Sequence, residues 1–187
     1  MKKIFYFLAF MLIPMMMSAQ KDIPAGMRME IAELELDNNE YSIFQYKDPD
    51  GTTAYYLSLG NVFHILGFFR DDITDMAIDH FDEACLVIGK TQEEAVAFMD
   101  ELLEFLNEKI GTKKEFQYRK TNGADLLTDT DISTCTVTKR FLQSKRLCFQ
   151  FVSGNRTVET DLKKSTIKNL RLNVKINKKL HPDKDDD

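Results

Sequence analysis

The sequence has no tryptophan and, among 187 residues, only four prolines, eight glycines and three cysteines. So few prolines and glycines exclude a collagen-like repeat and do not indicate a disordered chain. The lack of tryptophan weakens, without excluding, a stacking platform for sugars. Hydrophobic residues make up 43% of the chain, which predicts a compact globular protein with a real core.

The common signatures of nucleotide-binding proteins and hydrolases are also missing from the sequence. It contains no G-x-x-x-x-G-K-[ST], G-x-G-x-x-G, G-x-S-x-G or H-E-x-x-H motif. These absences favour a protein that is not an enzyme, although they do not exclude every catalytic mechanism.

Only the N-terminus carries a long uncharged apolar run. Lys2 and Lys3 precede the run from Ile4 to Met17, and small residues follow it at Ser18 and Ala19. This order is typical of a secretory signal peptide, and we expect cleavage after Ala19. The run is shorter than the roughly 20 residues of a membrane span, although an uncleaved anchoring helix is an alternative. No later segment is apolar enough to span a bilayer, so we expect a periplasmic or secreted protein without a transmembrane segment in its mature chain.

Three regions follow from this pattern: a signal peptide at 1–19, a single domain at 20–179, and a disordered acidic tail at 180–187. Within the domain, the apolar residues from Met29 to Leu36 alternate with one break, which indicates a strand with a β-bulge. The sequence DPDG at 48–51 is typical of a β-turn and predicts a hairpin.

The segment 91–110 predicts a long amphipathic helix. Thr91 and Glu94 form a capping-box pattern at its start, and Gly111 is suited to its C-terminal end. Between them lies a wide apolar stripe on one helical face. Its members are Ala95, Phe98, Met99, Leu102, Leu103, Phe105, Leu106 and Ile110.

The other segments have shorter patterns of apolar and turn-forming residues. The segment 61–76 predicts a connection with one or two helical turns, and a buried strand ends at Gly89. The turn-forming residues at 121–133 predict a loop, and 135–157 predicts a hairpin. A shorter C-terminal helix then begins near Thr160, and alternation in LNVKI allows a final strand.

Hairpins imply antiparallel pairing, so the predicted fold class is α+β. We expect a mostly antiparallel sheet of about five to seven strands. It would pack against the long helix at 91–110 and against the shorter C-terminal helix.

An odd number of cysteines in an exported protein leaves one of them unpaired in any set of disulfides. Cys135 and Cys148 are close enough in sequence to link neighbouring strands, which would leave Cys85 as a small buried side chain. The alternative is that no disulfide forms, since a core of this size does not need one.

The stretch AIDHFDEACLVIGK at 77–90 combines acids, His80 and Cys85 and raises the question of a reactive site. A zinc site there is disfavoured, because in a strand His80 and Cys85 would point to opposite faces. Cysteine–histidine catalysis is disfavoured as well, since apolar neighbours keep the Cys85 thiol protonated. The acids between Asp71 and Asp79 do not follow a calcium-loop pattern. We therefore interpret this stretch as a solvated approach to a buried strand, and we predict no metal and no cofactor.

Charge is distributed unevenly along the chain. Residues 21–131 carry a net charge of −14, and residues 139–179 carry a net charge of +10. Either the basic half binds a polyanion, or the two halves attract each other within one fold. The residues that we predict to bind an anionic ligand flank the second hairpin and the C-terminal helix: Lys139, Arg140, Lys145, Arg146, Lys163, Lys164 and Lys168.

The leading hypothesis is an exported, non-enzymatic binding or interaction domain of the cell envelope. Its partner would be an anionic glycan, a lipid headgroup or a protein; the export signal argues against nucleic acid as a physiological partner. The alternative is an exported hydrolase that uses carboxylates of the 71–83 region.

Overall fold

The computed structural model describes residues 23–36, 39–59, 83–122, 125–153 and 156–180. The expected signal peptide, the connection at 61–76 and the acidic tail beyond Leu180 lie outside these residues. The described elements, in chain order, are β1 Met27–Leu36, β2 Asn39–Lys47, β3 Thr53–Ser58, β4 Ala84–Gly89, α2 Gln92–Phe105, β5 Lys113–Asn122, β6 Asp125–Lys139, β7 Lys145–Ser153, β8 Arg156–Lys163 and α3 Lys164–Leu180.

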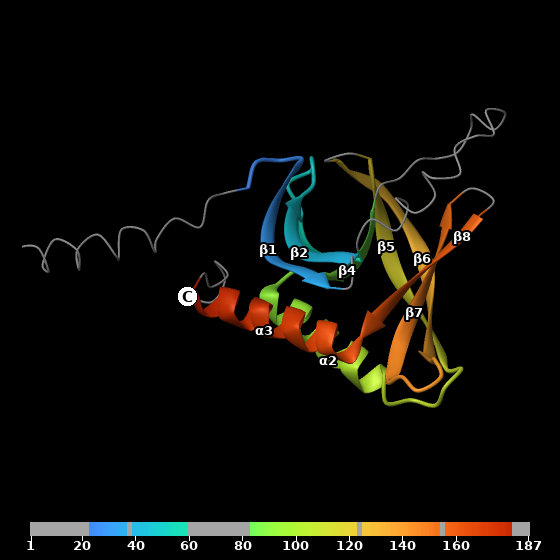
Figure 1. Cartoon of the computed structure of the whole chain (residues 1–187). Helices are drawn as coiled ribbons and strands as arrows, with labels where there is room; N and C mark the ends of the chain where they lie inside the picture. The colour runs from blue at the N-terminus through green and yellow to red at the C-terminus, as the bar shows by residue number, and fades with distance from the viewer. Residues whose placement is uncertain (1–22, 37–38, 60–82, 123–124, 154–155, 181–187) are drawn as a thin grey trace, which may run out of the picture.

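All eight strands form one antiparallel sheet whose spatial order follows the sequence from β1 to β8. The sheet is strongly curved, and both helices lie against the same side of it (Figure 1). The fold is therefore α+β, as predicted, but the expected five to seven strands was wrong. The segment 121–133, which we interpreted as a loop, contributes to the paired strands β5 and β6. Several of its polar residues, such as Thr128, Asp129 and Thr130, lie on exposed strand positions, where composition alone does not separate strand from loop.

The first hairpins follow the sequence pattern closely. The register of β1 against β2 shifts between Glu30 and Ala32, which is the predicted bulge. In the turn between β2 and β3, the amide of Gly51 donates to the carbonyl oxygen of Asp48 at 2.9 Å. Gly51 has a φ of 90°, a conformation that favours glycine.

Helix α2 begins where the capping pattern predicts. The side chain of Thr91 accepts a hydrogen bond from the amide of Glu94 at 3.2 Å. The carboxylate of Glu94 in turn accepts from the amide of Lys90 at 2.5 Å, one residue before the usual partner. The helix ends at Phe105, not at residue 110. The following loop is instead held beside β6, because the amide of Gly111 donates to the carbonyl oxygen of Val137 at 2.8 Å.

The C-terminal prediction needs two corrections. Thr160 lies within β8, opposite Phe149, and does not cap a helix. Helix α3 is longer than α2, with 17 residues against 14, and it includes the LNVKI segment that allowed a strand. The reason is packing, since Ile167, Leu170 and Val174 are fully buried at helical spacing.

The main core lies between the helices and one face of the sheet. Ile167 and Leu170 from α3 and Met99 and Leu102 from α2 join apolar side chains of every strand in one cluster. One hydrogen bond joins strands from opposite sides of the curved sheet. The hydroxyl of Tyr41 in β2, the second strand, donates to the carbonyl oxygen of Asp161 in β8, the last strand, at 3.1 Å. A smaller cluster occupies the opposite face: Phe44, Tyr46, Ala54, Tyr56, Cys85 and Leu126.

Replacing Gly89 with alanine should destabilise the fold. Gly89 has a φ of 141°, and an added Cβ would lie 2.4 Å from Cβ of Glu94. The strained backbone alone costs roughly 1–3 kcal/mol, and the contact with α2 adds to that cost. Urea denaturation followed by circular dichroism measures the loss. Gly51→Ala is the matched control, since Gly51 also has a positive φ but has no atom within 4 Å of an added Cβ. Equal losses for the two variants would contradict the clash with Glu94.

Candidate functional site

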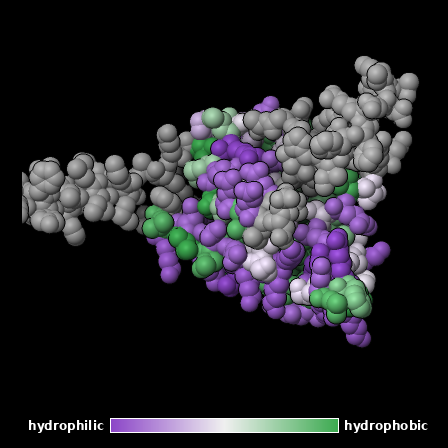
Figure 2. Space-filling model, viewed as in Figure 1, coloured by the Kyte–Doolittle hydropathy of each residue, from purple (hydrophilic) through white to green (hydrophobic). Residues whose placement is uncertain are grey.

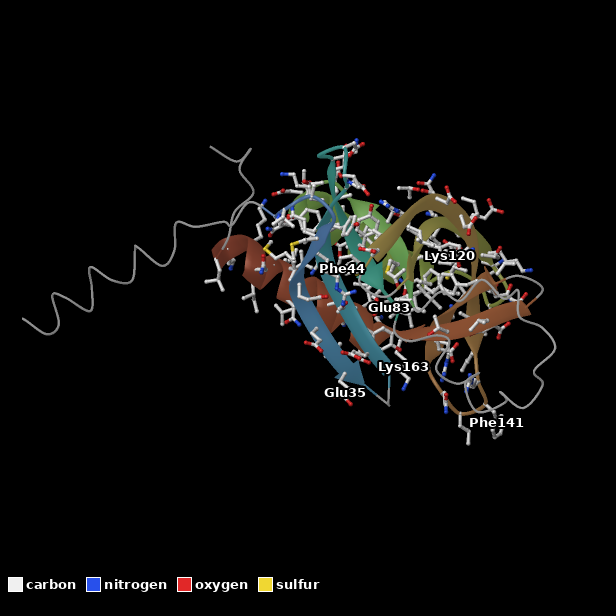
Figure 3. The ribbon with its side chains drawn as sticks, turned by 90° about the horizontal axis from the view of Figure 1, so that it is seen from above. Glu35, Phe44, Glu83, Lys120, Phe141 and Lys163 are labelled. Carbon is white, nitrogen blue, oxygen red and sulfur yellow. The ribbon has the colours of Figure 1, made fainter. Side chains whose placement is uncertain are left out.

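The basic residues predicted from the sequence gather at one end of the sheet, where β6, β7 and β8 meet the start of α3. Lys139 lies opposite Lys145 across the β6–β7 hairpin, and Arg146 lies opposite Lys163 across β7 and β8. Lys164 begins α3 directly after Lys163 ends β8. We call the seven residues Lys139, Arg140, Lys145, Arg146, Lys163, Lys164 and Lys168 the cationic end. Figure 3 labels Lys163 there.

Several members of the cationic end have partners within the protein. Asp161 in β8 pairs with Arg146 at 2.7 Å and with Arg140 at 2.9 Å. Arg146 also donates to the side chain of Gln143. The ammonium of Lys145 donates to the carbonyl oxygens of Asn107 and Glu108, just beyond the C-terminal end of α2.

The other members are more available to a ligand. Lys139, Lys164 and Lys168 are exposed, and none of them forms an ion pair with a residue that the structure describes. The Arg140 side chain is 69% exposed despite its pair with Asp161. Arg146 is buried, and its Nε atom has no hydrogen-bond partner in the described part of the chain. Asp161 therefore pairs with two arginines of the cationic end, while three lysines of this end are exposed and form no ion pair with a described residue.

The three cysteines are free, so the structure does not contain the Cys135–Cys148 disulfide. The strands are neighbours, but Cys135 lies opposite Phe149 and Cys148 lies opposite Thr136. Adjacent positions of a strand point to opposite faces, so the two thiols are on different sides of the sheet. Burial raises the pKa of all three thiols, and that of Cys148, beside Glu159, rises to about 11.

A second polar group, which the sequence pattern did not indicate, is centred on Arg119 in β5. Its guanidinium is buried and donates to both carboxylate oxygens of Asp48, at 2.9 and 3.0 Å. It also donates to the Tyr56 hydroxyl and to the carbonyl oxygens of Leu126 and Leu127. Burial alone would lower the pKa of Arg119, but the hydrogen bonds and charge interactions with Asp48 and Tyr56 together raise it by more. Because its hydrogen bonds are internal, we assign this group to stability.

Of the acidic 71–83 region, only Glu83 is described. Its carboxylate accepts from the Ser58 hydroxyl at 3.1 Å and pairs with Arg28 at 3.3 Å. Arg28 also pairs with Glu30 at 2.7 Å. The pKa of the Glu30 carboxyl is above its usual value, because the effect of burial is larger than the opposing effect of the Arg28 charge. His80 and the acids before Glu83 lie outside the described residues.

The described residues contain no group of three or more histidine, cysteine, aspartate or glutamate side chains placed to hold a metal ion. Among the same residues, no helix combines the length and the apolar character needed to cross a membrane.

Comparison with known proteins returned no match to a family model, to a curated protein or to a solved structure.

The thiols should resist alkylation in the folded protein. With a pKa of about 11, the Cys148 thiol is about one part in a thousand thiolate at pH 8, and only the thiolate reacts. We expect negligible labelling by iodoacetamide at pH 8. Cys148 should be the first site modified as the pH rises, with the sites mapped by mass spectrometry. Rapid labelling of Cys85 at pH 8, or an intact mass that shows a disulfide, would contradict the structure.

Replacing Arg119 with methionine should destabilise the protein by about 3 kcal/mol, because it leaves the Asp48 carboxylate without its partner. Chemical denaturation measures the loss. Arg28→Met is the control, since the partly exposed ion pairs of Arg28 with Glu30 and Glu83 contribute about 1 kcal/mol or less. Asp48→Asn in the Arg119→Met background should recover part of the loss, and a double variant no more stable than Arg119→Met would argue against the pairing.

Proposed function

We propose that this protein is an exported, non-enzymatic binding domain of the cell envelope that binds an anionic ligand through its cationic end. The observation that carries the proposal is the convergence of seven basic side chains on one end of the sheet, with Asp161 as the carboxylate that pairs with two of them. The signal-like sequence at 1–19 supports a periplasmic or secreted location.

The chemistry of the cationic end suits phosphate, sulfate or carboxylate groups. Lysine ammonium groups act as mobile point charges, and Arg140 adds planar donors for oxyanions. In an exported protein these groups would meet anionic glycans or lipid headgroups before nucleic acid.

The alternative of a hydrolase that uses carboxylates of the 71–83 region has one described candidate, Glu83, which shares its partner Arg28 with Glu30. A glycosidase needs one carboxyl group that stays protonated and one that ionises, and the raised pKa of Glu30 is in that direction. Arg28 opposes this division of roles, since its charge lowers the pKa of Glu30. The binding function therefore has the stronger support.

Retention on an immobilised polyanion across a salt series tests the binding function. We expect retention at low salt that weakens steeply as salt rises. Reversal of the three exposed lysines, as Lys139→Glu, Lys164→Glu and Lys168→Glu, should move elution to much lower salt. None of the three forms an ion pair with a described residue, so no such pair is lost.

The matched control reverses Lys47, Lys90 and Lys179 to glutamate, which changes the net charge by the same amount at positions outside the cationic end. Its elution should stay close to that of the unaltered chain. Equal shifts in both triple variants would mean that net charge alone governs retention, and the cationic end would lose its role.

A further inference from the structure

The turn between β6 and β7 carries two large apolar side chains with almost no protein contact. Phe141 is 91% exposed and Leu142 is 89% exposed, whereas the other exposed large apolar residues of the described chain range from 39% to 58%. We call these two residues the hairpin tip. Figure 2 shows an apolar patch at the lower right among hydrophilic side chains, where this turn lies in Figure 1. Figure 3 labels Phe141 at the outer limit of the molecule.

The backbone conformation is a second indication that the hairpin tip has a function. Leu142 has a φ of 59°, the only positive φ of a non-glycine residue among those that the structure describes. The left-handed conformation is unfavourable for a residue with a Cβ atom, and glycine or asparagine would adopt it more easily. Leucine at this position therefore weakens the turn and gains no packing within the fold.

Cations surround the base of the hairpin tip. Lys139 and Lys145 face each other across the hairpin, and the Arg140 side chain is 69% exposed. The loop after α2 lies beside the same end of β6, through hydrogen bonds between Gly111, Val137 and Thr112. This loop adds a further exposed apolar residue, Ile110. An apolar tip thus projects beyond three basic residues of the hairpin, Lys139, Arg140 and Lys145.

We propose that the hairpin tip inserts into the interface of an anionic lipid bilayer while the surrounding cations bind the headgroups. This inference rests on the proposed binding function and identifies the ligand as a lipid surface. Apolar side chains gain free energy at the boundary of headgroups and acyl chains, and nearby lysine and arginine residues are attracted to anionic headgroups. A protein partner fits less well, because a stable interface needs about 800 Å² on each side, far more than two side chains on a narrow turn offer.

The absence of tryptophan from the chain makes this insertion directly observable. In the full chain, Phe141→Trp places the sole tryptophan at the tip, so its fluorescence reports on the tip and not on the apolar N-terminus. The probe is vesicles of phosphatidylglycerol and phosphatidylcholine in equal parts. We expect a blue shift of the emission and quenching by lipids brominated in their acyl chains. Raised salt, or vesicles of phosphatidylcholine alone, should reduce both effects.

Val152→Trp is the matched control. Val152 is 54% exposed and lies on β7 at the end away from the tip, roughly 23 Å along the strand from Lys145. Its emission should not shift. Adding Leu142→Ser to Phe141→Trp should raise the lipid concentration at half-maximal shift by about tenfold, because one inserted apolar side chain is lost.

An unshifted Phe141→Trp emission with anionic vesicles would overturn the inference, and so would equal shifts at positions 141 and 152 or equal shifts with neutral and anionic lipid. None of these results decides the polyanion experiment, whose lysine variants leave Phe141 and Leu142 intact. Retention that depends on the cationic end, combined with an unshifted emission at position 141, would support the binding function and exclude a lipid surface as its ligand.

Discussion

The packing of both helices against one face of the sheet is the interaction on which the rest of the structure depends. Ile167, Leu170 and Val174 of α3 are fully buried there, and each such side chain contributes about 1.5–3 kcal/mol by leaving water. The chain passes from β8 into α3 without a linker, since Lys163 ends the strand and Lys164 begins the helix. The same packing therefore fixes Lys164 and Lys168 beside the ends of β7 and β8 and creates the cationic end.

Because strand side chains alternate between faces, about half of them point to the face that the helices do not cover, and they are packed in a different way. Buried aromatic rings there are combined with arginines. The guanidinium of Arg28 lies 4.9 Å from the ring centre of Phe44, and that of Arg119 lies 5.5 Å from the ring centre of Tyr56. Arg119 has five hydrogen bonds for its five N–H donors, and these bonds link β3, β5, the start of β6 and the β2–β3 turn. This network adds to the burial of the smaller apolar cluster in holding these strands in place.

Local signals were predictable from the sequence, and long-range geometry was not. The DPDG turn, the bulge near Glu30 and the start of α2 at Thr91 depend on residues close in sequence, and the structure contains all three. The end of α2 depends on contacts with β6, and the helical state of LNVKI depends on burial against the core, so neither follows from the segment alone. The basic residues of the site could be named because their charge is visible in the sequence. Their convergence required the strand register, as did the separation of Cys135 from Cys148. The exposure of the hairpin tip could not be predicted, because a sequence pattern does not distinguish an exposed phenylalanine in a tight turn from a buried one.

The opposed charges of the two halves have different outcomes at the two ends of α3. Towards its C-terminal end, Arg171 pairs with Asp100 at 2.6 Å and Lys178 pairs with Glu93, both on α2. There, the basic half and the acidic half attract each other within one fold. At its N-terminal end, Asp161, which belongs to the basic half itself, pairs with Arg140 and Arg146 of the cationic end. The acidic half meets this end through the backbone carbonyl oxygens that accept from Lys145. The two explanations of the charge asymmetry are thus compatible, since α2 neutralises one end of α3 and leaves the excess of positive charge at the end next to the exposed hairpin tip.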